Sequence, residues 1–160
     1  MRVAVCPGSY DPITRGHVDV IARTAALFDR VYVCVLVNGE KSGGMFAPQE
    51  RLRLASRAVE DMENVSAELY TGLLAEYAGQ RGACALVKGI RNGTDLDWEH
   101  QMAHVNRALC PGLETILLPA RQELSWLSST VAREMLRYRQ PMEQYLPGAV
   151  VEELRKMGRL

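Results

Sequence analysis

Five short segments of this chain predict β-strands, and all but the third are almost continuously apolar. Strands that are apolar on both faces must be covered by helices on both faces, which favours a parallel sheet. Segments with apolar residues at helical spacing alternate with these strands. We therefore predict an α/β fold, a doubly wound five-stranded parallel sheet in a single domain. The expected strands are Val3–Cys6, Val31–Val37, Val65–Leu69, Ala83–Val87 and Glu114–Leu118.

Helices are expected between and after these strands. Thr94 and Asp97 stand in the spacing of a capping box, with Asp in place of the usual Glu, and predict the start of the fourth helix. No repeat or linker divides the 160 residues, a length that suits one domain with a substantial core. We expect the helices from about residue 129 onward to pack on that domain. The six segments are His17–Phe28, Pro48–Val59, Leu73–Gln80, Thr94–Leu109, Ser129–Tyr138 and Val150–Met157.

Charge and composition argue against several classes of protein. Lys plus Arg and Asp plus Glu both number 19, so no net charge points to nucleic acid or a membrane surface. No apolar run approaches the roughly 20 residues that cross a bilayer, and no signal peptide is evident, so a cytoplasmic location is expected. The four cysteines form no Cys-x-x-Cys pair. Cys6, Cys34 and Cys84 lie in or beside apolar runs, where we expect reduced, buried thiols.

Ligands of doubly wound sheets bind beyond the carboxyl ends of the strands. The segments that leave those ends here are PGSYDPITRGH, VNGEKSGGMF, KGIRNGTD and PARQELSWLSST. The first delivers Gly16 and His17 to a helix start, where N–H groups favour an anion and glycine lets it approach closely. A neutral imidazole there can donate a hydrogen bond to growing negative charge. The alternative is a histidine that only caps or packs the helix end.

The other three segments also have structural alternatives. Lys41 is either a solvated loop charge or a point charge for phosphate. Lys88 and Arg91 place two cations at a strand end, an arrangement that is costly unless they are solvated or paired with an anion. Ser128 is either an N-cap or, with the two hydroxyl residues after it, part of a phosphate-binding nest. No segment decides alone, but four potential phosphate sites at one sheet edge indicate a phosphorylated ligand.

Metal and dinucleotide sites are not supported. His100 and His104 stand at i, i+4, a spacing that can hold zinc, but Glu99 precedes the first histidine rather than following it. No third ligand is evident, so no protein-bound metal is expected. The chain also lacks Gly-x-Gly-x-x-Gly and a P-loop, which argues against a dinucleotide oxidoreductase and a P-loop kinase.

Taken together, PGSYDPITRGH, the lysine of NGEK, KGIRNGTDLDWEHQMAHVN and SWLSST resemble bacterial phosphopantetheine adenylyltransferases over nearly the whole chain. TRGH is a variant of the HxGH signature of the nucleotidyltransferase superfamily, which implies that residues 1–160 form one Rossmann-like nucleotidyltransferase domain. The resemblance implies direct attack of 4'-phosphopantetheine on the α-phosphate of ATP, giving dephospho-coenzyme A and pyrophosphate without a covalent intermediate. It also implies Mg²⁺ held mainly through the ATP phosphates and a homohexamer, and it leaves feedback inhibition by coenzyme A (CoA) open.

The resemblance implies a role for each matching residue. Catalysis falls to His17, Lys41 and Arg91. The acceptor contacts Ser9, Lys41, Leu74 and Lys88, and Ser9 touches both substrates. The ATP site comprises Ser9, Tyr10, His17, Gly89, Ile90, Arg91, Glu99, Leu124, Ser125, Trp126, Leu127, Ser128, Ser129 and Thr130.

This chain departs from the family pattern at three places. Lys88 stands where many members have arginine, which keeps the charge but loses bidentate geometry. Trp98 replaces a more usual tyrosine, and the segment NGEKSGGMF is longer than some versions of that loop. None of these changes removes a group that the chemistry requires.

Two alternatives remain open. A nicotinamide mononucleotide adenylyltransferase or a cytidylyltransferase keeps the superfamily and changes the acceptor, but these enzymes usually carry histidine where this chain has Thr14. A non-catalytic nucleotide-binding or regulatory module is a different class. The presence of His17, Lys41 and Arg91 argues against it, and a measurement of turnover separates the two.

Overall fold

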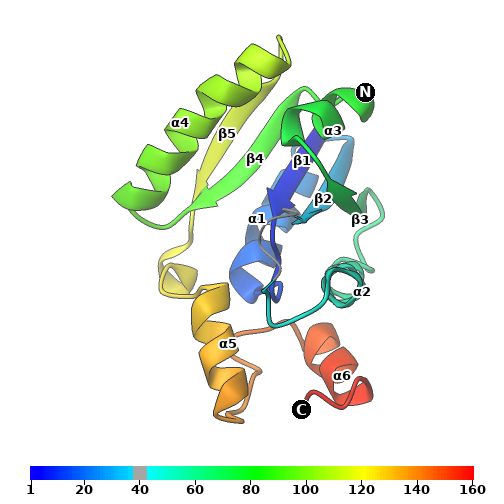
Figure 1. The fold of residues 1–160 in the computed structure, drawn as a ribbon, viewed down its shortest axis with the longest axis vertical. Coiled ribbons are helices and arrows are strands. Elements are labelled where there is room, and N and C mark those ends of the chain that lie inside the picture. Colours follow the sequence, from blue (N-terminus) through cyan, green and yellow to red (C-terminus); the bar gives the residue numbers. More distant parts are fainter. Residues whose placement is uncertain (38–42) are drawn as a thin grey trace.

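The computed structural model describes residues 1–37 and 43–160. Its centre is a parallel five-stranded sheet of order β3–β2–β1–β4–β5, so the sheet order reverses between β1 and β4 (Figure 1). The predicted doubly wound parallel sheet is confirmed, with each strand close to its expected bounds. The strands are β1 (Val3–Gly8), β2 (Arg30–Val37), β3 (Val65–Thr71), β4 (Ala85–Ile90) and β5 (Glu114–Pro119).

The predicted helices are also present, together with a short 3-10 turn that the sequence analysis did not anticipate. Among the described residues, no helix combines the length and the apolar character needed to cross a membrane. The elements are α1 (Arg15–Ala25), α2 (Pro48–Ala58), α3 (Leu74–Gln80), α4 (Gly93–Leu109), η1 (Gln122–Leu124), α5 (Ser129–Arg137) and α6 (Gly148–Lys156).

The central strands are apolar on both faces because each face meets a different hydrophobic cluster. Successive strand residues point to opposite faces of a sheet. In β1, Ala4 and Cys6 join a large cluster that includes residues of α1, α2, α5 and α6. Val5 joins a smaller cluster beside Tyr77 of α3. The pattern that predicted a sheet covered on both sides is therefore explained by the packing.

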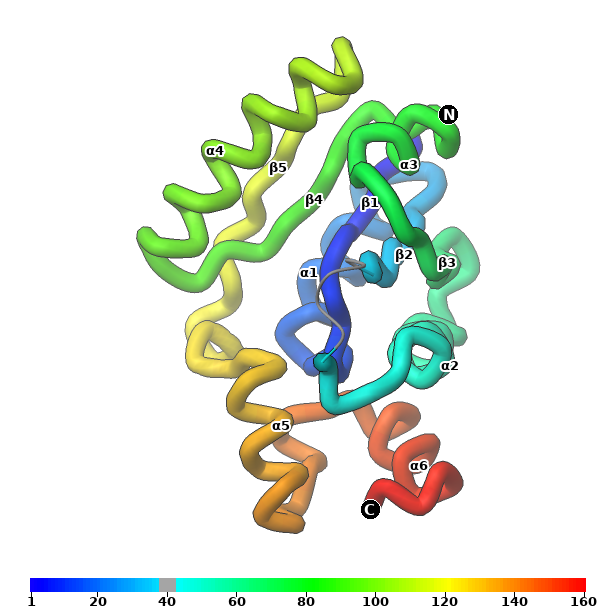
Figure 2. The backbone as a smooth tube through the Cα atoms, viewed as in Figure 1, coloured from blue at the N-terminus to red at the C-terminus, as the bar shows by residue number. Residues whose placement is uncertain are grey.

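The two C-terminal helices share the core of the sheet. Ala132 of α5 and Leu154 of α6 are completely buried in the large cluster that contains residues of β1 and β2. Helix α6 also packs on α2, where the buried Glu153 carboxylate pairs with Arg53 and Arg57. Figures 1 and 2 place α5 and α6 at the end of the molecule toward which β1 points.

Two local predictions were wrong. Helix α4 is capped by Asn92, whose side-chain oxygen accepts a hydrogen bond from the Asp95 N–H at 2.9 Å. Thr94 cannot be the N-cap because it already lies inside the helix, whereas Asn92 has the extended backbone that a cap requires. Cys84 is exposed because β4 begins one residue after it. The other two thiols expected in the core are buried.

Candidate active site

A cavity of about 370 Å³ lies at the carboxyl ends of β1 and β4, where the strand order reverses. This is the place where ligands bind in doubly wound sheets. The β1–α1 turn, α1, the end of β4, α4 and the start of α5 all contribute to its lining. The cavity brings together these predicted site residues: Ser9, Tyr10, His17, Lys88, Gly89, Arg91, Glu99, Leu124, Leu127, Ser128, Ser129 and Thr130.

The β1–α1 turn packs Tyr10 against His17. Tyr10 adopts a left-handed backbone with φ of 48°, followed by a cis Asp11–Pro12 peptide bond. Its hydroxyl donates to the Cys6 carbonyl at 2.8 Å, and its ring meets the His17 ring edge-on, with centroids 5.0 Å apart. The buried tyrosine thus forms one wall behind the histidine.

His17 is the third residue of α1 and forms a capping box with Thr14. The ring nitrogen Nδ1 of His17 accepts a hydrogen bond from the backbone N–H of Thr14 at 3.0 Å. The backbone N–H of His17 donates to Thr14 Oγ1 at 3.4 Å. A ring nitrogen that accepts carries no proton, so the neutral ring is protonated at Nε2. The capping role therefore leaves His17 with an N–H donor on the other side of its ring.

The surroundings of His17 keep its ring neutral. Burial is the main cause that lowers the pKa of His17 from 6.5 to about 4, and the positive charges of Arg91 and Lys88 act in the same direction. The imidazole therefore carries no charge at neutral pH. It can donate one hydrogen bond to a phosphate oxygen, as the sequence analysis expected of a residue at a helix N-terminus.

The two cations at the carboxyl end of β4 are each paired with a carboxylate of α4. Lys88 Nζ lies 3.1 Å from Glu99 Oε1, and Arg91 Nε lies 3.1 Å from Asp95 Oδ2. Arg91 Nη1 also donates to the Leu127 carbonyl at 3.3 Å. Because Asp95 and Glu99 are one helical turn apart, the same face of α4 orients both cations beside the cavity.

The start of α5 combines capping with a ligand-facing position. Ser128 is the N-cap, and its Oγ accepts from the Val131 N–H at 3.2 Å. Ser129 Oγ donates to the Pro12 carbonyl of the β1–α1 turn at 2.8 Å. Both serines and Thr130 line the cavity. The hydroxyls thus fix the helix start, and the first backbone N–H groups of α5 remain the groups suited to an anion.

Charge makes this cavity suitable for a polyanion. The N-termini of α1 and α5 both meet it, and each carries the positive end of a helix dipole. Gly16 lines the cavity at the N-terminus of α1. A Cβ placed on this glycine would have Thr14 Oγ1 as its nearest neighbour, at 3.6 Å, so the space beside Gly16 is open. Lys88 and Arg91 add two cationic side chains, which Glu99 and Asp95 balance in the free protein.

Some predicted site residues lie outside the lining. Ile90 follows Gly89 in β4 and so points to the other face of the sheet. Trp126 donates to the Glu123 carbonyl and packs against Tyr145, and it is absent from the lining. Ser125 and Leu74 are also absent from the lining: Ser125 Oγ bonds the Gln122 carbonyl, and Leu74 packs on the smaller cluster. Lys41 lies outside the described residues.

The lining also contains residues that the sequence analysis did not assign to the site. Val20 and Ile21 lie three and four positions after His17 in α1, so helical spacing from the histidine was a signal for both. Asp95, in the first turn of α4, also lines the cavity. Sequence offered no comparable signal for Val87 or Ala120, which reach the cavity only because β4 and β5 end beside it.

Comparison with known proteins first defines the class. A family model described as Cytidylyltransferase-like matches residues 5–135. The structure of Plasmodium falciparum nicotinic acid mononucleotide adenylyltransferase complexed with NaAD is similar, with a TM-score of 0.68 over 98% of this chain and 95% of that chain. At 13% identity this likeness concerns the fold alone. Fold and cavity together are those of a nucleotidyltransferase-like α/β protein.

Relatives of known name narrow the class. The phosphopantetheine adenylyltransferase of Clostridium novyi (strain NT) is 38% identical over 100% of this chain and 99% of its own length. That of Streptomyces coelicolor (strain ATCC BAA-471 / A3(2) / M145) is 43% identical over 96% of each chain. This chain belongs to the phosphopantetheine adenylyltransferase family.

The depressed pKa of His17 predicts a pH dependence of stability. An unfolded histidine titrates near 6.5, so the unfolded chain binds a proton between about pH 6.5 and 4 that the folded chain excludes. The free energy of unfolding therefore falls by up to about 3 kcal/mol as the pH drops through this window, and it is insensitive to His17 above it. NMR titration, with His17→Gln to assign the resonance, should give a pKa near 4; a value above 6 contradicts the argument.

Proposed function

We propose that this chain transfers the adenylyl group of ATP to 4'-phosphopantetheine, giving dephospho-CoA and pyrophosphate, the penultimate step of CoA biosynthesis. The observation that carries the proposal is the near-complete match to phosphopantetheine adenylyltransferases at 38% to 43% identity. The nicotinic acid mononucleotide enzyme with the same fold shares only 13%. This contrast favours phosphopantetheine over a mononucleotide acceptor.

The reaction brings two polyanions together. A phosphate oxygen of phosphopantetheine forms a bond to the α-phosphorus of ATP in line with the bond to pyrophosphate, which breaks as the new bond forms. The attacking phosphate is already ionised at neutral pH, so neither a nucleophilic side chain nor a strong general base is required. Catalysis then consists of orienting both reactants and stabilising charge at the pentavalent phosphorus.

The cavity residues divide between the two reactants. His17 donates its Nε2 proton in a hydrogen bond to an α-phosphate oxygen, and Arg91 neutralises phosphate charge on the nucleotide side. Lys88 and Lys41 hold the acceptor phosphate, and Ser9 contacts both reactants. Two observations support these roles. His17 Nδ1 accepts a hydrogen bond, which leaves the proton on Nε2, and Lys88 and Arg91 are each held beside the cavity by a carboxylate of α4. The role of Lys41 rests on its sequence motif.

The remaining assignments complete the two subsites. The backbone of Leu74 contacts the pantetheine arm, at the edge of the acceptor side. Nucleotide contacts come from the β1–α1 turn, the end of β4, α4 and the segment that leads into α5. Those that line the cavity are Tyr10, Gly89, Glu99, Leu124, Leu127, Ser128, Ser129 and Thr130. Ile90, Ser125 and Trp126 lie outside the lining, and their assignment rests on the sequence resemblance alone.

We also propose Mg²⁺ as the cofactor, held mainly by the phosphates of ATP. No group of three or more His, Cys, Asp and Glu side chains among residues 1–37 and 43–160 is arranged to hold a metal ion. The cavity carboxylates Asp95 and Glu99 are engaged by Arg91 and Lys88. Bound Mg²⁺ supplies neutralisation of phosphate charge; the orientation of the reactants comes from the chain.

The chain is proposed to act as one cytoplasmic domain in a homohexamer, with CoA as a candidate feedback inhibitor. Helix α4 favours assembly because it exposes Leu96, Trp98, Val105 and Leu109, and these apolar side chains are 44% to 60% exposed.

Light scattering should give a particle of six chains. Val105→Glu places a charge on the exposed α4 face and should lower the mass, because burying an unpaired charge at an interface is costly. Gln140→Glu, at an exposed polar position beyond the end of α5, is the matched control and should leave the hexamer intact. A monomeric parent protein refutes the hexamer.

Pyrophosphate release tests the proposed reaction. The protein with ATP and Mg²⁺ should release pyrophosphate rapidly with 4'-phosphopantetheine and not with unphosphorylated pantetheine or nicotinamide mononucleotide, because the acceptor phosphate is the attacking group. Release with nicotinamide mononucleotide keeps adenylyl transfer but overturns the acceptor. If the protein binds ATP but releases no pyrophosphate with any of the three acceptors, the result favours a regulatory module.

The proposed role of His17 predicts a kinetic defect with little loss of substrate binding. His17→Ala should lower kcat by at least about 100-fold, as removal of a key transition-state donor does. ATP binding should persist, because Arg91 and two helix N-termini remain. Steady-state kinetics and calorimetric ATP titration on folded protein measure both effects. A kcat close to that of the parent removes His17 from the mechanism.

A further inference from the structure

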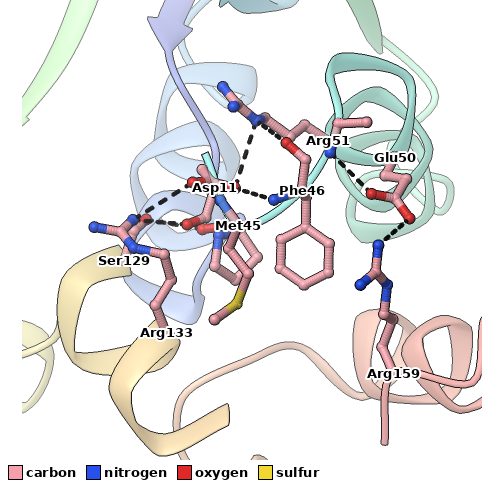
Figure 3. Close-up of polar contacts among 10 residues, drawn as sticks. Asp11, Met45, Phe46, Glu50, Arg51, Ser129, Arg133 and Arg159 are labelled. Carbon is pink, nitrogen blue, oxygen red and sulfur yellow. Dashed lines mark hydrogen bonds and ion pairs between the residues drawn. The ribbon is translucent and has the colours of Figure 1, made fainter. Parts of the chain in front are cut away.

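A buried carboxylate outside the cavity joins segments that are distant in sequence. Asp11 is 7% exposed and belongs to the turn that contains Tyr10 and leads into α1, where His17 lies. Its Oδ2 accepts a hydrogen bond from the Met45 N–H and its Oδ1 from the Phe46 N–H, both at 2.9 Å (Figure 3). The side chain thereby fastens the β1–α1 turn to the chain that leads into α2.

Two arginines complete the surroundings of this carboxylate. Arg51 Nε, from α2, lies 3.4 Å from Asp11 Oδ1 and donates to the Phe46 carbonyl at 2.8 Å. Arg133 Nη1, from α5, lies 3.8 Å from Asp11 Oδ2. An added Cβ at Gly44 would collide with the Arg51 guanidinium, so the glycine leaves room for this pair. The negative charge of Asp11 is thus satisfied by backbone donors and cations, as a buried charge requires.

The same turn is bonded to the first residues of α5, which line the cavity. Arg133 Nη1 donates to the Asp11 carbonyl at 2.8 Å, and its Nη2 donates to Thr130 Oγ1 at 3.2 Å. Ser129 Oγ donates to the Pro12 carbonyl at 2.8 Å. Figure 3 shows Ser129 and Arg133 reaching the turn from α5 while Arg51 approaches from α2. The turn is therefore held from both sides.

We propose that Asp11 is a positioning residue for adenylyl transfer: it holds the β1–α1 turn between α2 and α5, and so sets His17 on one wall of the cavity relative to the α5 start on the other. Asp11 itself does not line the cavity. A displacement of about 1 Å in a transition-state donor costs on the order of 100-fold in rate. ATP binding in the ground state is shared among many groups. Loss of Asp11 therefore lowers kcat much more than it weakens ATP binding.

A purely stabilising role is the competing explanation, and the fold offers a matched comparison. Glu153 is also a buried carboxylate, 4% exposed, and it pairs with Arg53 and Arg57 between α6 and α2. None of these three residues lines the cavity. Glu153→Gln and Asp11→Asn each remove one buried charge at nearly constant volume, so a general loss of stability affects both variants.

The proposal rests on the proposed function and is tested by comparing these two variants. Urea unfolding gives the stability of each variant, and calorimetry gives the Kd for ATP. Pyrophosphate release gives kcat, measured at a temperature well below that at which either variant unfolds. Asp11→Asn should lower kcat at least about 30-fold and change the ATP Kd less than about threefold. Glu153→Gln should keep kcat within about twofold of the parent although it is also destabilised. A kcat for Asp11→Asn within about threefold of the parent, or an equal loss in both variants, overturns the proposal.

Two further measurements keep the test decisive. If Asp11→Asn fails to fold, Arg133→Lys replaces it. Lysine keeps the positive charge but lacks the two guanidinium N–H donors that bond the Asp11 carbonyl and Thr130. The kcat of Arg133→Lys should fall about 10-fold, and an unchanged kcat overturns the proposal.

If the parent protein itself releases no pyrophosphate, the proposed function fails, and the NMR titration of His17 then decides the role of Asp11. In Asp11→Asn a loosened turn admits water and should raise the pKa of His17 by at least about one unit, whereas an unchanged titration shows that Asp11 does not position it.

Discussion

The structure depends on the reversal of strand order between β1 and β4. At that point the connections leaving the two strands diverge and leave a cavity between them. The N-termini of α1 and α5 meet this cavity, and Lys88 and Arg91 line it at the carboxyl end of β4. Backbone dipoles and side-chain charges therefore act on the same small volume, which is the electrostatic environment that two phosphorylated reactants need.

Structural and functional roles coincide in several of these residues. His17 caps α1 through Nδ1, and that same bond fixes the tautomer that leaves a proton on Nε2. Ser128 caps α5 and lies at the cavity. Asp95 caps no helix; it holds Arg91, and Glu99 holds Lys88 one turn later. Capping and ligand binding are therefore not alternatives at these positions, because a helix N-terminus that is held open for an anion requires both.

Much of the site could be predicted from sequence because its residues cluster in motifs that follow strands. A strand end, a glycine and a helix start are local signals, and they located His17, Lys88 and Ser128 correctly beside one cavity. The sequence predictions failed where a residue's role depends on neighbours that are close in space but not in sequence. Thr94 and Asn92 both have side chains that can cap a helix, and Asn92 is the cap because its backbone is extended while Thr94 already lies inside the helix. Ala120 lines the cavity because β5 lies next to β4, a relation that no local pattern contains.

The sequence by itself determined the parallel α/β class, the order and approximate extent of its elements and the family, because apolar periodicity and contiguous motifs are properties of the chain alone. Only the tertiary structure decided which charges pair and which segments brace the site. Asp11 is separated from Phe46 and Arg133 by long stretches of chain, yet its carboxylate and carbonyl bond to both segments. Such long-range pairs depend on how whole helices and strands pack. A buried charge must be hydrogen-bonded or paired, and its partners are the groups that the fold brings within hydrogen-bond distance.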